Sequence, residues 1–128
     1  MNFSHTVKTQ KNIDDTIATL TEDLKEIGFG VLEILDFKKI LLEKGVDFKD
    51  NYRLMEVCNP NLAKQVIEDS PDLGLLLPCT IAVYHKDGEN FISLARPTSL
   101  LAMASENNLK FSGEEIENNL IRIIENAK

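Results

Sequence analysis

The sequence of 128 residues lacks tryptophan and has only two cysteines. Two cysteines are too few for a disulfide-rich scaffold. The longest apolar stretch, residues 73–79, is far shorter than the roughly 20 residues of a transmembrane helix. The first residues lack the basic start and apolar core of a signal peptide. We therefore expect a cytoplasmic protein whose two cysteines are free thiols.

Basic side chains are also scarce. Fourteen Lys and Arg stand against 21 Asp and Glu, which gives a formal charge of −7. The densest basic stretch is the pair Lys38 and Lys39. Nucleic acids and anionic membranes bind through clusters of basic side chains. We therefore expect neither a nucleic acid nor a membrane as a partner.

The common catalytic motifs are absent as well. The chain has no phosphate-binding loop, dinucleotide fingerprint, G-x-S-x-G elbow or H-E-x-x-H pair. No cofactor is expected, and the sequence does not decide whether the protein is an enzyme.

What is present is the balance of a globular protein. Apolar residues make up 43% of the chain and charged residues 27%, which predicts a single domain over residues 1–128. Alternating and helical hydrophobic periods follow one another along the chain. They predict strands over 2–8, 29–35, 52–58, 79–85 and 91–96, and helices over 13–27, 37–44, 60–69, 99–104 and 114–124.

Several residues mark where these elements begin. Asn12 and Asn59 are typical N-caps, the second followed by Pro60 at the first helical position. Thr98 or Ser99 is expected to cap a short helix. Ser112 and Glu115 form a capping box for the last one.

The dipeptide Asp87-Gly88 predicts a hairpin between two strands. A hairpin requires antiparallel pairing, so we predict an α+β fold. The expected sheet is mixed and mostly antiparallel, with helices packed on one face, in the order β-α-β-α-β-α-β-β-α-α.

Cys58 and Cys79 are the first candidate site. Cys58 directly precedes the helix start at Asn59, where free amides favour a thiolate. The segment between the cysteines is long enough to return Cys79 to the same end of the sheet. The alternative is that both are small buried hydrophobic residues.

Two further constellations are weaker. The two thiols with His5 or His85 fall short of a four-ligand zinc site, so no metal is expected. Arg96, just before a predicted helix start, could hold a carboxylate or phosphate. Its alternative is an ion pair with one of the many acidic residues.

Five short segments resemble, in order and spacing, the prokaryotic family catalogued as domain of unknown function 302. They are Lys44-Gly45-Val46-Asp47-Phe48, residues 52–60 with Cys58-Asn59-Pro60, Asp72-Leu73-Gly74-Leu75-Leu76-Leu77-Pro78-Cys79, Val83-Tyr84 and Arg96-Pro97. The resemblance implies a compact α+β domain that forms a homodimer, and it implies no reaction, cofactor or substrate. It marks as typical of the family Cys58, Asn59, Pro60, Gly74, Pro78, Cys79 and Arg96.

Two functions follow as hypotheses. The first is a homodimeric module that binds a small molecule, an anionic ligand or a partner in a pocket formed by Cys58, Asn59, Cys79 and Arg96. The apolar connection 73–77 either packs under helices or contacts the second subunit, and we favour the contact because two-fold dimers are the commonest assembly. The second hypothesis is redox or sulfur chemistry at Cys58, with Cys79 as the resolving thiol.

Overall fold

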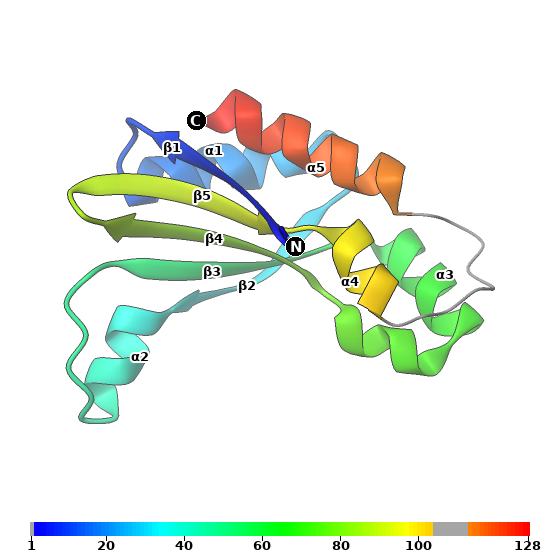
Figure 1. The fold of residues 1–128 in the computed structure, drawn as a ribbon, viewed down its shortest axis with the longest axis horizontal. Coiled ribbons are helices and arrows are strands. Elements are labelled where there is room, and N and C mark those ends of the chain that lie inside the picture. Colours follow the sequence, from blue (N-terminus) through cyan, green and yellow to red (C-terminus); the bar gives the residue numbers. More distant parts are fainter. Residues whose placement is uncertain (1, 104–112) are drawn as a thin grey trace.

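A computed structural model describes residues 2–103 and 113–128. In the described part, five strands alternate with helices in the predicted order (Figure 1). The elements are β1 (Ser4–Thr9), α1 (Ile13–Lys25), β2 (Gly30–Asp36), α2 (Phe37–Glu43), β3 (Tyr52–Cys58), α3 (Pro60–Asp69), the 3₁₀ helix η1 (Pro71–Leu76), β4 (Cys79–Lys86), β5 (Glu89–Ala95), α4 (Pro97–Met103) and α5 (Glu114–Ala127).

The strands form one sheet in the order β1-β5-β4-β3-β2. All four pairings between the described strands are antiparallel, where the sequence left room for some parallel pairing. The predicted α+β fold is confirmed, and so is the hairpin at Asp87 and Gly88, which joins β4 to β5. The apolar connection 73–77 lies largely in η1.

The two long helices, α1 and α5, lie side by side over one face of the sheet (Figure 1). They bury the apolar side of the three central strands, whose residues alternate between the two faces. The core includes Leu20, Leu24, Met55, Val57, Ile81, Val83, Ile92, Leu94, Leu120 and Ile124. The short helices α3 and α4 lie beyond the end of the sheet where β3 ends and β4 begins, and α2 lies at the other end (Figure 1).

The predicted helix starts are only partly correct. Asn12 caps α1 by accepting a hydrogen bond from the Asp15 amide at 2.8 Å, as expected. The prediction for α4 is wrong, because this helix begins at Pro97 and Thr98 lies inside it.

None of the described helices has the length and apolar character needed to cross a membrane.

The predicted capping box of α5 is replaced by a glycine. Gly113 occupies the N-cap position with a φ of 81°, and Ser112 lies outside the described residues. A Cβ atom at Gly113 would stand 2.8 Å from a methyl carbon of Leu101. The absence of a side chain at this position therefore lets α4 approach the start of α5.

Candidate ligand-binding site

Cys58 and Cys79 lie at the same end of two neighbouring strands. Cys58 is the last residue of β3, and Cys79 is the first residue of β4. The antiparallel register places Cys79 directly opposite Val57, the residue before Cys58. The chain between them, α3 and η1, therefore leaves the sheet and returns to the same end, as predicted.

The two thiols nevertheless belong to different faces of the sheet. Val57 is fully buried in the core, and Cys79 packs against that core. Strand alternation directs Cys58 to the opposite face from Val57 and Cys79. Both cysteines are half-buried free thiols.

The surroundings of Cys79 disfavour its thiolate. Burial raises the pKa of the Cys79 thiol to about 11, and the nearby Cys58 adds to the increase. A charged sulfur loses more hydration than a neutral one when it leaves water. Cys79 is therefore a protonated, apolar side chain at neutral pH.

An apolar cavity lies beside Cys79. It has a volume of about 40 Å³, and every described residue in its wall is apolar. Since one water molecule needs roughly 10–15 Å³, there is room for several atoms of a ligand. The wall includes Leu62 and Val66 of α3, Leu73 of η1, Cys79 of β4, Leu100 of α4 and Ile116 of α5.

The apolar connection supplies part of this wall. Leu73 is only 2% exposed, and Leu76 and Leu77 also line the cavity. Leu75 points away and is 84% exposed. The connection therefore packs mainly under the helices, and Leu75 alone remains for the contact with a second subunit that the sequence suggested.

Asn59 lines a second cleft, whose wall combines polar side chains with apolar ones such as Ile27 and Phe29. Its side chain caps α3 by accepting a hydrogen bond from the Leu62 amide at 3.2 Å. The cleft has a volume of about 310 Å³ and runs between α3 and α5. Leu62 and Ile116 line both the cavity and the cleft, so these two side chains separate Cys79 from Asn59.

Arg96 is held by a buried carboxylate. Its Nε and Nη2 donate to Oε2 of Glu117 at 3.2 and 3.1 Å, and its Nη1 donates to the Asn2 carbonyl oxygen. The other oxygen, Oε1, accepts from the Thr98 amide and hydroxyl. Glu117 thus compensates the Arg96 charge and holds the start of α4. The contact matches the alternative expected for Arg96, an ion pair with an acidic residue.

Burial by itself would raise the pKa of Glu117. The hydrogen bonds from the Thr98 side chain and amide and from Arg96, together with the Arg96 charge, outweigh that effect and lower the pKa below its usual value. Sequence reasoning missed Glu117. The available signal was its position three residues before Leu120 and seven before Ile124, on the apolar face of the last helix.

The predicted site residues are thus only partly brought together. Cys79 lines the cavity and Asn59 lines the cleft, whereas Cys58 is outside the walls of both. Arg96 is engaged by Glu117.

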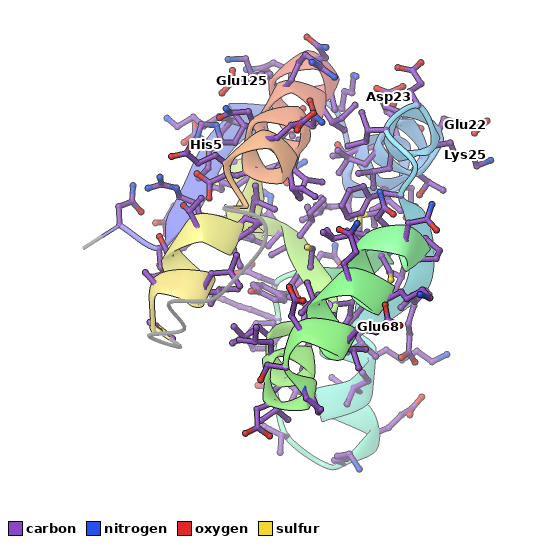
Figure 2. All side chains as sticks on the ribbon, turned by 90° about the vertical axis from the view of Figure 1, so that its right-hand side faces the viewer. His5, Glu22, Asp23, Lys25, Glu68 and Glu125 are labelled. Carbon is purple, nitrogen blue, oxygen red and sulfur yellow. The ribbon has the colours of Figure 1, made fainter. Side chains whose placement is uncertain are left out.

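The two histidines have partners of their own. His5 Nε2 lies 2.9 Å from Glu125 Oε2, and the two side chains appear together on the upper part of the molecule in Figure 2. His85 Nδ1 lies 2.7 Å from Asn90 Oδ1. Within residues 2–103 and 113–128, no three His, Cys, Asp or Glu side chains gather closely enough to hold a metal ion.

Comparison with known proteins yields a family and a structural relative. The family model for DUF302, a domain of unknown function, matches residues 5–127 of this sequence. The crystal structure of an uncharacterized conserved DUF302 protein from Bacillus stearothermophilus is similar, with a TM-score of 0.92, 35% identity and 98% of each chain covered. No curated protein sequence matches the chain. The match over almost the whole sequence and the shared fold show that this chain belongs to the DUF302 family.

Proposed function

We propose that the protein is a small-molecule-binding module that holds the apolar part of its ligand in the cavity beside Cys79. The observation that carries the proposal is that every described residue in the wall of this cavity is apolar, with contributions from four helices and from the ends of β4 and β5. Small-molecule sites are typically concave and mostly apolar. The described side chains of the wall offer no catalytic acid or base, so binding is the function that they support.

Alkyl probes test this proposal. Burial of a methylene group stabilises a complex by about 0.8 kcal/mol, so a short alkyl chain should bind in the millimolar range. We expect n-butanol to produce saturable shifts in the methyl NMR signals of Leu62, Val66 and Leu73. These three side chains line the cavity.

A matched pair of variants separates cavity volume from sulfur chemistry. Cys79→Ala keeps the space and should still bind n-butanol, whereas Cys79→Leu fills it and should not. Val66→Phe fills the cavity from α3 and serves if Cys79→Leu fails to fold. Absence of saturable shifts in the wild-type protein, or equal binding by Cys79→Ala and a folded filled variant, would overturn the proposal.

We also propose that the module is a homodimer that associates through Leu75 and Ile67. Leu75 is 84% exposed and Ile67 is 47% exposed. Ile67 lies beside Gly74, the residue before Leu75, since a Cβ atom at Gly74 would contact the Ile67 side chain at 3.4 Å. A second copy would remove both exposed aliphatic side chains from water. The cytoplasmic location expected from the sequence remains a prediction.

The alternative, thiol chemistry at Cys58 with Cys79 as the resolving thiol, has less support. The two cysteines are close in the backbone, but strand alternation directs their side chains to opposite faces. The raised pKa of Cys79 also keeps it protonated. A disulfide forming under mild oxidation, seen as the loss of both free thiols in the monomeric chain, would favour this alternative.

A further inference from the structure

We propose that the cavity beside Cys79 and the cleft beside Asn59 are two halves of one site, which takes an amphipathic molecule with a short alkyl chain and an uncharged, hydroxyl-rich head group. This inference rests on the proposed function, since the alkyl chain would occupy the cavity. It adds the chemistry of the head group, which the cavity alone does not specify.

The cavity and the cleft are adjacent. Leu62 of α3 and Ile116 of α5 line both spaces, so one layer of side chains separates them. Both side chains are only partly buried and pack against the edge of the core. In the proposed site, rotation of these two side chains would connect the cavity with the cleft.

Polar side chains from α3 and α5 line the cleft. Asn61 and Gln65 lie one turn apart on α3, and Glu115 and Asn119 lie one turn apart on α5. Residues four apart share one face of a helix. Two polar rows therefore line the cleft, one on each helix. Among the described residues, none of the four side chains has a hydrogen-bond partner, so their donors and acceptors are free for a ligand.

The charges in the wall of the cleft favour an uncharged head group over an anionic one. The described wall of the cleft contains no Lys or Arg, and its single ionisable group is Glu115. An anionic head group would meet a carboxylate and a chain of net charge −7. Carboxamides both donate and accept hydrogen bonds, as do hydroxyl groups. The cleft therefore matches a neutral polyol or sugar better than a phosphate or carboxylate.

Three probes with the same chain and different heads test this assignment by NMR titration. They are n-butanol, n-butyl-β-D-glucoside and sodium n-butyl sulfate. We expect the glucoside to bind about tenfold more tightly than n-butanol, as two added hydrogen bonds would allow. The sulfate should bind more weakly than the glucoside, and the glucoside should also shift the side-chain amide signals of Asn61, Gln65 and Asn119.

Variants on α3 assign the gain to the cleft. The double variant Asn61→Ala/Gln65→Ala should lose the roughly tenfold advantage of the glucoside while binding n-butanol as before. The matched control is Lys64→Ala/Glu68→Ala, which removes an exposed ion pair from the same helix at two positions outside the described wall of the cleft. It should leave both affinities unchanged.

The outcomes separate this inference from the proposed function. Butanol binding with no advantage for the glucoside, or a sulfate that binds as tightly as the glucoside, would overturn the head-group assignment and leave the cavity proposal intact. The head-group assignment is also overturned if Lys64→Ala/Glu68→Ala reduces the advantage of the glucoside as much as Asn61→Ala/Gln65→Ala does. If neither butanol nor the glucoside binds, both proposals fail.

Discussion

Arg96 donates two hydrogen bonds to the same carboxylate oxygen of Glu117, at 3.2 and 3.1 Å. This contact joins the end of β5 to α5. The second oxygen of Glu117 holds the Thr98 amide and hydroxyl, so one buried carboxylate fixes the end of a strand and the start of α4.

Replacement of Glu117 should therefore destabilise the folded protein. We expect Glu117→Gln to lower the free energy of unfolding by about 1.5–3 kcal/mol, the range for hydrogen bonds to a charged group. Urea unfolding at pH 7 measures the loss. Glu115→Gln, at an exposed position on the same helix, is the control and should change little. Equal effects of the two variants would contradict the role given to Glu117.

The same carboxylate should make stability depend on pH. Because its pKa is lower in the folded state, its contribution is present above the ordinary Glu pKa of 4.5 and is lost as the pH falls through the lowered value. We expect unfolding free energy to decline with acid more steeply in the wild type than in Glu117→Gln. Parallel pH profiles for the two proteins would show that Glu117 titrates normally.

The two cysteines should differ in reactivity. In Cys58→Ser, the remaining Cys79 should react slowly with iodoacetamide at pH 7, and its rate should rise well above neutral pH, because burial, the larger of the two causes, still raises its pKa. Labelling rates measured by mass spectrometry against pH give the midpoint. Rapid labelling of Cys79 at neutral pH in the folded protein would contradict this assignment.

Leu75 provides the test of the dimer. We expect the wild-type protein to sediment as a dimer and Leu75→Asp to sediment as a monomer, because the substitution places a charge in the proposed contact. The control is Leu42→Asp, at another exposed leucine, on α2. A monomeric wild type, or dissociation by both variants, would refute the contact.

The turn between β4 and β5 gives a prediction about the backbone alone. Gly88 has a φ of 81°, and a Cβ atom there would meet nothing within 4 Å. Gly88→Ala should therefore cost about 1–2 kcal/mol through conformation only. Gly30→Ala, also in open space but without a positive φ, should cost nothing. Thermal unfolding of both variants makes the comparison.

Local sequence signals predicted most of the fold. Asn12, Asn59 and the Asp87-Gly88 turn mark element boundaries through hydrogen bonds and dihedral angles formed within a few residues. Such signals depend on neighbours in the chain, so they can be recognised without the tertiary structure. The segment lengths permitted, but did not require, the return of Cys79 to the strand end of Cys58, which the structure shows.

The candidate site depended on contacts that local signals do not specify. Glu117 meets Thr98 and Arg96 across about twenty residues of sequence, and this contact, rather than a cap by Thr98 or Ser99, fixes the start of α4. The cleft needs Asn61 of α3 opposite Asn119 of α5. Nothing in either segment alone indicates that the two helices face each other.

The walls of the cavity belong mainly to α3, η1 and α4, which connect or follow strands, whereas α1, α5 and the sheet build the core. Substitutions in those connecting segments can reshape the pocket while the strand register stays the same. The segments that build the core are thus mostly different from the segments that line the pocket. Relatives could diversify in what they bind, and an engineer could exchange these segments as a cassette on an unchanged scaffold.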